Sequence, residues 1–194
     1  MSSPSQSGGL EAGLSALARG GINLAAHLRT EDCLSIAPEL GSELSRFPGL
    51  LLLGSAGPRL WESLREEGYL EGPDPVDSYC RDRVRVFRTK LSDEPEKASQ
   101  LAWPNPAGQP IAVTELGELA GWSSRSPLGL GIHPEHGLWF AYRAVLLLEA
   151  EAPQQQPAAS PSPCLTCLDK PCVSHCPAGA VGGPKGLDIV ACFT

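Results

Sequence analysis

The stretch LGLGIHPEHGLWFAYRAVLLLEA, residues 128–150, carries the strongest structural pattern in the chain. Its second half, Leu138 to Ala150, is rich in aromatic and branched residues, and this composition predicts a long central strand. Its first half is a glycine-rich loop that contains His133. Because glycine lacks a side chain, such a loop lets a flat ligand approach the backbone closely. A P-loop or dinucleotide site is not indicated, since no strand pattern precedes the glycines and no helix pattern follows them.

The segments before this stretch predict further helices and strands. Apolar residues over Leu10–Leu28 predict a helix interrupted near Gly20-Gly21. The run GLLLLG at 49–54 predicts a short buried strand, and Pro58 predicts the start of a helix. After these we expect a proline-rich loop over 92–110, a short strand over 111–114 and a short helix over 115–122.

The clearest helix signal follows Asp74, which we expect to be the N-cap, with Pro75 at the first helical position. An apolar stripe runs along this helix at spacings of four, four, three and four residues, and it consists of Val76, Cys80, Val84, Phe87 and Leu91. We therefore expect Cys80 to lie in the core. A second face carries Arg81, Arg85 and Arg88. It is either a solvated basic face, the commoner case, or a docking face for an anionic ligand or partner.

The composition is that of an ordinary globular protein. Of 194 residues, 42% are hydrophobic and 19% are charged, which suits one domain with an appendage. The net charge of 15 − 22 = −7 argues against a nucleic-acid partner held through phosphate contacts. No apolar run approaches the roughly 18 residues of a membrane span. Residues 1–7 lack a signal-peptide pattern, so we expect a cytoplasmic protein with no membrane partner.

Shifts in composition predict four parts of the chain. We expect a disordered start over residues 1–8, because Ser and Gly dominate there. An α/β domain is expected over 9–150, and a Pro/Gln/Ala tract at 151–163 predicts a linker. Residues 164–194 follow as a small cysteine-rich module.

The cysteine-rich module predicts an iron–sulfur site. Its run C-x2-C-x4-C-x3-C-P matches the bacterial ferredoxin spacing except for two extra residues in the middle gap. The secure ligands of one [4Fe–4S] cluster are Cys164, Cys167 and Cys172. Either Cys176 or Cys192 completes the cluster, or the chain is a truncated piece of a two-cluster protein.

Zinc binding is the alternative for these thiols. A zinc ribbon or knuckle usually needs a second CxxC pair at a longer separation, and the chain has none. His133 and Glu135, followed by Cys164 and Cys167, also fit the zinc-deaminase signature H-x-E…P-C-x-x-C. A strand pattern follows this histidine instead of the helix that a deaminase requires, so this remains a remote alternative.

The pattern G-I-H-P-x-x-G-x-W-F-A-x-R in residues 131–143 resembles the CblC-type cobalamin-processing proteins. The helix start at Pro73–Asp77 and the Leu-rich strand and helix at 49–66 resemble theirs too, over roughly residues 47–150. Residues 125–192 also resemble epoxyqueuosine reductases and, more distantly, corrinoid reductive dehalogenases. These resemblances imply an α/β fold, an α+β sandwich that is nitroreductase-like, with a small C-terminal ferredoxin-like iron–sulfur module.

The resemblance implies that cobalamin binds with its lower base displaced. The implied cofactor-binding residues are Gly129, Gly131, His133, Trp139, Phe140 and Tyr142. CblC-type proteins have a C-terminal arginine-bearing region associated with glutathione, and this chain has the cysteine run in its place. The alternative for His133 is that it caps the loop and binds nothing.

Two functions follow as expectations. The first is an oxidoreductase that passes electrons from the cluster to a bound corrinoid, for cobalamin reduction or removal of its upper ligand. It would require an electron-donor protein of the flavodoxin or ferredoxin type. The second is a ferredoxin-like electron carrier without corrinoid chemistry. No basic surface for tRNA is evident, which disfavours epoxyqueuosine as substrate.

Overall fold

The computed structural model describes residues 4–43, 45–104, 110–152, 161–183 and 186–193. The chain forms two compact units. The first comprises Met1–Val113 and Phe140–Gln156, and the second comprises Thr114–Trp139 and Pro157–Thr194. Most of the predicted linker lies at 153–160, outside the described residues.

A four-stranded antiparallel sheet forms the centre of the first unit. Its strands are β1 (Leu24–Arg29), β2 (Gly49–Ala56), β6 (Phe140–Leu148) and β3 (Ser99–Trp103), in the order β1-β2-β6-β3. The predictions of a buried strand at 49–54 and of a central strand in 138–150 are therefore confirmed. Strand β2 is buried at every position, which explains why its sequence is a continuous apolar run.

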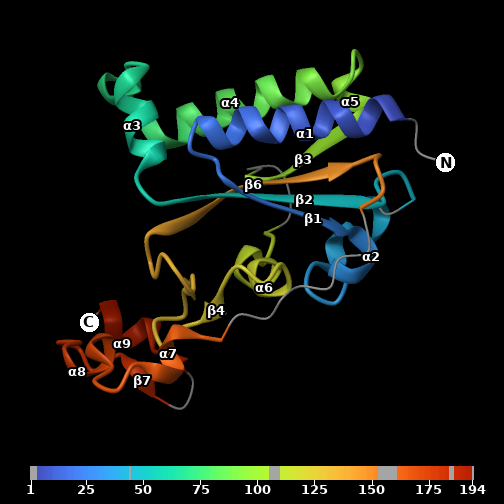
Figure 1. The fold of residues 1–194 in the computed structure, drawn as a ribbon. Coiled ribbons are helices and arrows are strands. Elements are labelled where there is room, and N and C mark those ends of the chain that lie inside the picture. The colour runs from blue at the N-terminus through green and yellow to red at the C-terminus, as the bar shows by residue number, and fades with distance from the viewer. Residues whose placement is uncertain (1–3, 44, 105–109, 153–160, 184–185, 194) are drawn as a thin grey trace. The chain divides into compact units, whose positions relative to one another are not determined.

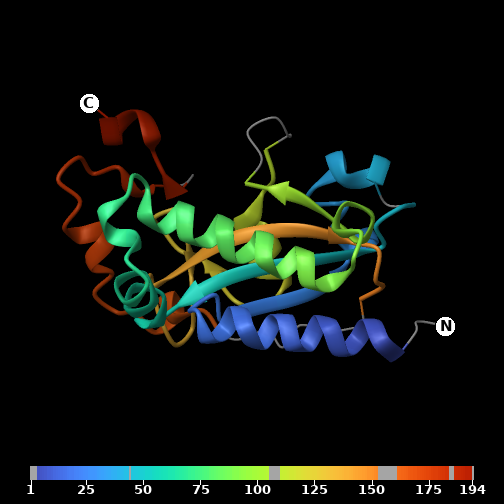
Figure 2. The ribbon, with the colours of Figure 1, turned by 90° about the horizontal axis from the view of Figure 1, so that it is seen from above.

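Two helices, α1 (Pro4–Arg19) and α4 (Pro75–Leu91), lie side by side over one face of this sheet (Figures 1 and 2). The core between the helices and the sheet contains alternate residues of β2 and β6 together with the apolar stripes of both helices. It includes Leu17, Leu51, Leu53, Tyr79, Cys80, Val84, Phe87, Ala144, Leu146 and Leu148. Cys80 lies in the core as predicted. The remaining elements of the unit are α2 (Thr30–Cys33), η1 (Pro38–Glu43), α3 (Arg59–Glu66), η2 (Tyr69–Glu71) and α5 (Pro95–Ala98).

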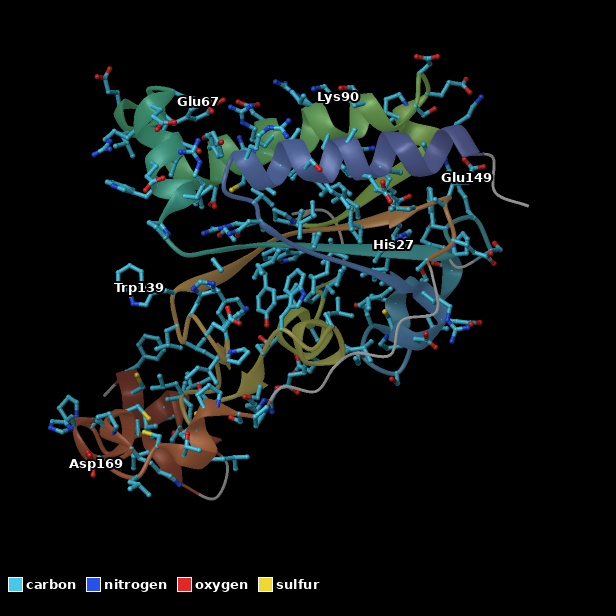
Figure 3. The ribbon with its side chains drawn as sticks, viewed as in Figure 1. His27, Glu67, Lys90, Trp139, Glu149 and Asp169 are labelled. Atoms are coloured by element: carbon cyan, nitrogen blue, oxygen red, sulfur yellow. The ribbon has the colours of Figure 1, made fainter. Side chains whose placement is uncertain are left out.

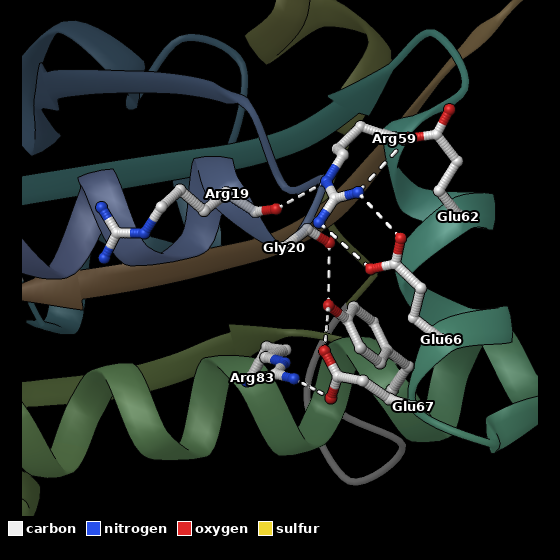
Figure 4. Close-up of polar contacts among 8 residues, drawn as sticks. Arg19, Gly20, Arg59, Glu62, Glu66, Glu67 and Arg83 are labelled. Carbon is white, nitrogen blue, oxygen red and sulfur yellow. Dashed lines mark hydrogen bonds and ion pairs between the residues drawn. The ribbon is translucent and has the colours of Figure 1, made fainter.

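The C-terminal end of α1 is joined to α3 and α4 by polar contacts (Figure 4). The last carbonyl groups of a helix lack partners within that helix. Here Arg59 Nε donates to the carbonyl oxygen of Arg19 at 2.8 Å, and the hydroxyl of Tyr79 donates to that of Gly20 at 2.9 Å. An ion pair between Glu67 and Arg83 lies beside Tyr79. These contacts fix where the chain leaves α1 for β1.

Several sequence predictions for this unit are wrong. The described part of the expected disordered start is helical from Pro4, a residue type suited to the first turn of a helix. The helix expected over Leu10–Leu28 ends at Arg19, and its last part is β1. The expected loop 92–110 contains α5 and β3, because pairing with the distant β6 makes a strand of Ser99–Trp103. No strand forms over 111–114, since α6 begins at Val113.

The second unit contains short elements. Helix α6 (Val113–Leu119) leads into a hairpin of β4 (Ser124–Arg125) and β5 (Gly131–Ile132). The cysteine-rich part comprises α7 (Pro163–Thr166), α8 (Pro171–Ser174), β7 (Val181–Gly183), β8 (Gly186–Leu187) and α9 (Ile189–Phe193). Throughout the described segments, every helix is too short or too polar to cross a membrane.

Candidate functional site

The cysteines of the predicted cluster lie on or directly after three one-turn helices. Cys164 is in α7 and Cys167 follows it, Cys172 is in α8 and Cys176 follows it, and Cys192 is in α9. Proline begins both α7 and α8, where its fixed φ suits the first helical position. All five thiols are free and at least partly accessible. The proline positions in the motif therefore act as helix starts that place the following cysteine.

Cys176 has the most distinctive environment of these thiols. Backbone N–H groups, that of Ala180 above all and then those of Ala178, Val181 and Gly179, lower the pKa of this thiol, although some burial opposes this. Gly179 makes the turn possible, because its φ of 60° lies in the left-handed region. Thiolates are the ligands of iron–sulfur clusters, and backbone N–H groups around the sulfur favour the thiolate.

Within the described ranges, no three His, Cys, Asp or Glu side chains lie close enough together to hold one metal ion. The zinc-deaminase constellation of His133, Cys164 and Cys167 is therefore not assembled in this structure. A [4Fe–4S] cluster binds each cysteine through a different iron, so its ligands do not converge on one point. Four thiols within 13 residues of sequence are a donor set of the kind that such a cluster uses, while the cluster itself remains a prediction.

The glycine-rich loop forms a double turn in the second unit. Gly129, with a φ of 74°, closes the β4–β5 hairpin, and Gly131 lies in β5. Beyond β5, the backbones of His133 and Gly137 exchange two hydrogen bonds of 2.9 Å. Inside this turn, Nδ1 of His133 accepts hydrogen bonds from the backbone N–H groups of Glu135 at 3.1 Å and His136 at 3.2 Å. The imidazole therefore caps the turn, as expected if the role of His133 is to hold the loop in shape.

The burial of His133 also favours the neutral form of its imidazole. The residue is buried, and desolvation lowers its pKa, with a further lowering by His136 and an opposing effect of Glu135. A neutral ring is needed for Nδ1 to accept the two hydrogen bonds. Any hydrogen bond from His133 to a ligand amide would therefore have to come from Nε2.

The three predicted aromatic contact residues are divided between the units. Trp139 belongs to the second unit and is 82% exposed, and its ring extends outward in Figure 3. Phe140 and Tyr142 belong to the first unit, where their rings form an edge-to-face pair with centroids 5.4 Å apart. The structure thus groups the loop residues with Trp139, and groups Phe140 with Tyr142.

Tyr142 also lines a cavity of about 590 Å³ in the first unit. Helix α4 forms one wall of this cavity, and strands β3 and β6 form the others. The lining residues are Asp77, Cys80, Arg81, Val84, Arg85, Arg88, Leu101, Trp103, Pro104, Tyr142, Arg143 and Ala144. The arginine face of α4, for which the sequence allowed either a solvated or a docking role, thus borders a cavity. Sequence reasoning missed the cavity because its walls come from three separate segments.

The two cysteines outside the C-terminal run are core residues. Burial raises the pKa of the Cys33 thiol to about 12 and that of the Cys80 thiol to about 11. Both side chains are buried, and thiols in such surroundings stay protonated and unreactive.

Comparison with known proteins identifies a solved structure with a similar fold. The chain matches no protein-family model and no curated protein. Its structure is similar to the crystal structure of the C. elegans B12-trafficking protein CblC, with a TM-score of 0.54 and 16% sequence identity over 80% of this chain and 76% of that one. At this identity the likeness shows the fold alone. The α+β fold expected from the resemblance to CblC-type proteins is therefore confirmed, and the ferredoxin-like module stays a prediction.

Proposed function

We propose that this protein binds a corrinoid and takes part in its reduction or in the removal of its upper ligand. The observation that carries the proposal is the fold, which is similar over 80% of the chain to that of a B12-trafficking protein. The segment G-I-H-P-E-H-G-L-W-F-A-Y-R, residues 131–143, adds independent support from the sequence.

The corrinoid contact in this proposal is the double turn around His133. Gly129 and Gly131 leave the backbone bare, so a flat ring can approach it closely. Exposed Trp139 can add an apolar contact. His133 holds the turn in shape through Nδ1, and in this proposal its ring also contacts a corrin side-chain amide. It is a positioning and contact residue here and is not proposed as a cobalt ligand.

The C-terminal cysteines supply the reductant in this proposal. Cys164, Cys167, Cys172 and either Cys176 or Cys192 would hold a [4Fe–4S] cluster. When bound, such a cluster supplies single electrons at low potential. The backbone N–H groups around Cys176 favour its thiolate and so prepare it as a ligand. Elemental analysis of anaerobically purified protein tests this part: about four irons with sulfide are expected, and a colourless protein with one zinc would contradict it.

A spectroscopic titration tests the corrinoid part. Adding the anaerobic protein in excess to cob(II)alamin is expected to shift the visible spectrum towards the base-off form. His133→Ala should weaken this shift, whereas His136→Ala, which keeps the backbone N–H to His133, is the matched control. An unchanged spectrum with protein that contains iron and sulfide would leave the plain electron carrier as the function.

A further inference from the structure

The large apolar side chains that are exposed lie mainly in the second unit. In the described residues of the first unit they are Trp61, Leu70 and Val86, and all the others belong to the second unit. Exposed apolar side chains that gather in one part of a protein mark an interaction site. In the cysteine-rich module, four of them are between 62% and 93% exposed, and they are Leu165, Leu168, Ile189 and Phe193. These four side chains are the apolar surface of the module.

The two leucines of this surface are sequence neighbours of thiols in the proposed cluster site. Leu165 directly follows Cys164, and Leu168 directly follows Cys167. Consecutive Cα atoms are only about 3.8 Å apart, so residues next to the ligands of one cluster lie around that cluster. Both leucines therefore lie at the edge of the cluster in the proposed function.

Helix α9 supplies the other two side chains of the surface. Ile189 and Phe193 are four residues apart in this helix, so they lie on the same face of it. Phe193 directly follows Cys192, one candidate for the fourth ligand. The residue before α9 donates its N–H to the carbonyl oxygen of Ala180 at 2.8 Å, which fixes the helix to the turn after Cys176, the other candidate. The apolar face of α9 is therefore close to the cluster site with either ligand.

The part of the chain that carries this surface has no net charge. Residues 161–194 contain two acidic side chains, Asp169 and Asp188, and two basic ones, Lys170 and Lys185. The net charge of −7 therefore arises from the rest of the chain. A surface that complements this one is apolar and uncharged, in contrast to the opposite-charge patches that steer many complexes. Salt, which weakens ionic association, should not weaken binding of this kind.

The size of the surface favours a transient partner over a stable one. Burying one large apolar side chain removes on the order of 100 Å² from water, so the four amount to roughly 400 Å². Stable complexes bury about 800 Å² on each partner, whereas redox encounters bury less than about 1,200 Å² over both partners together. A permanent dimer would need about twice the area that these side chains offer. A short-lived redox encounter needs no more than they offer.

We propose that a flavin-bearing one-electron carrier of the flavodoxin type docks on the apolar surface of the module to reduce the cluster. This inference rests on the proposed function, because it requires a cluster behind the surface. The dimethylbenzene edge of a flavin is apolar and uncharged, so it complements leucine and phenylalanine side chains. In the docked pair one electron moves: the reduced flavin loses it and the cluster gains it.

Stopped-flow reduction of the anaerobic, iron-containing full-length protein tests this surface. Reduced flavodoxin is the probe, and dithionite is the control reductant, because a small anion needs no docking surface. Leu168→Gln combined with Phe193→Gln should slow reduction by flavodoxin at least about tenfold and leave the iron content and the dithionite rate unchanged. Trp61→Gln is the matched control, since it removes an exposed apolar side chain of α3 in the first unit. The wild-type rate with flavodoxin should not fall between about 50 and 300 mM salt.

Three results would overturn the docking proposal. The first is a double variant that flavodoxin reduces at the wild-type rate, or a wild type that dithionite reduces and flavodoxin does not. The second is a wild-type rate that falls steeply with salt, which would assign docking to a charged surface. The third is a dimer in light scattering that becomes monomeric in the double variant, which would assign the surface to a second copy of the chain.

A second variant covers the case in which the double variant loses iron. Ile189→Gln changes the same face of α9 at the end of the helix away from Cys192, and the same two rates decide the outcome. Failure of the proposed function is seen separately, as protein without iron or as an unchanged cob(II)alamin spectrum. Neither of those measurements uses the donor, so the two failures are distinguishable.

Discussion

Two histidines, the half-buried His27 and the buried His133, have surroundings that favour the neutral imidazole. Desolvation lowers the pKa of His27, whose Nε2 lies 3.3 Å from the carbonyl oxygen of Ala150, an interaction that partly opposes the shift. Desolvation lowers the pKa of His133 too. Both rings are therefore structural groups at neutral pH.

We expect these two rings to make stability depend on pH. Their folded-state pKa values lie below the unfolded value of 6.5, so the unfolded chain binds protons first as the pH falls. The stabilisation is complete above pH 6.5 and is lost as the pH falls below it towards the folded pKa values. Urea denaturation at pH 7.5 and 5.5 measures this, and NMR titration of the ring protons should place both midpoints below 6.5. A midpoint at or above 6.5 for either ring would contradict the burial argument.

The hydrogen bonds to Nδ1 of His133 are open to a direct test. His133→Ala removes the acceptor of two backbone N–H groups and should cost about 1 kcal/mol of unfolding free energy. His133→Asn should cost less, because an Asn side chain can accept from a backbone N–H two residues further on. Equilibrium urea denaturation compares the two variants with the wild type. Equal stability of all three would show that the imidazole does not hold the turn.

At the scale of elements, the close packing of α1 against α4 depends on one glycine. A Cβ atom at Gly13 would lie 2.8 Å from the ring of Phe87, which is buried in the core, whereas a Cβ at Gly9 would meet its nearest neighbour at 3.8 Å. Both glycines lie inside α1. The two positions therefore share the helix and differ in the space beside them.

This contrast predicts opposite effects of the same substitution. Gly9→Ala should raise the unfolding free energy by about 0.5–1 kcal/mol, because alanine loses less backbone entropy in a helix. Gly13→Ala has the same advantage in backbone entropy, but its Cβ forces the Phe87 ring to move. Overpacking of this kind costs about 1–3 kcal/mol. Thermal and urea unfolding of both variants shows whether each substitution raises or lowers the unfolding free energy. A stabilised Gly13→Ala variant would mean that α1 and α4 can separate freely.

Elements with a local signal were predictable from the sequence, and those defined by a distant partner were not. Helix α4 has a complete apolar stripe, and the leucine run of β2 is bounded by glycines. Strand β3 lies in a proline-rich region and becomes a strand only through pairing with β6, some 40 residues later in the chain. The cysteine run and the His133 loop were also visible as local patterns. The cavity beside α4 could not be predicted, because Arg81 and Arg143 are far apart in the sequence and line the same cavity only in the folded chain.

At the scale of the whole molecule, the two units differ in how much core they contain. The sheet unit has a large buried core, whereas several apolar residues of the cysteine-rich part are exposed, including Leu165 at 80% and Leu168 at 93%. If the cysteine-rich part binds a cluster as proposed, a module with so little buried surface is expected to depend on that cluster for folding.

We therefore expect Cys164→Ser combined with Cys167→Ser to abolish the cluster but to leave a cooperative thermal transition of the sheet unit. Circular dichroism and iron analysis of the same sample measure the two properties together. Cys80→Ala is the matched control: its thiol is in the core, so iron should remain while stability falls. Collapse of the whole chain in the double variant would contradict independent folding of the two units.

The strand order has a consequence for synthesis on the ribosome. Strand β6 lies between β2 and β3, yet it is translated after both of them and after residues 114–139 of the second unit. Until it emerges, β3 has no hydrogen-bonded neighbour, and β2 is paired with β1 on one edge and has no partner on the other. A nascent chain that has reached residue 139 therefore holds an unfinished sheet, and the next nine residues to be translated, Phe140–Leu148, close it.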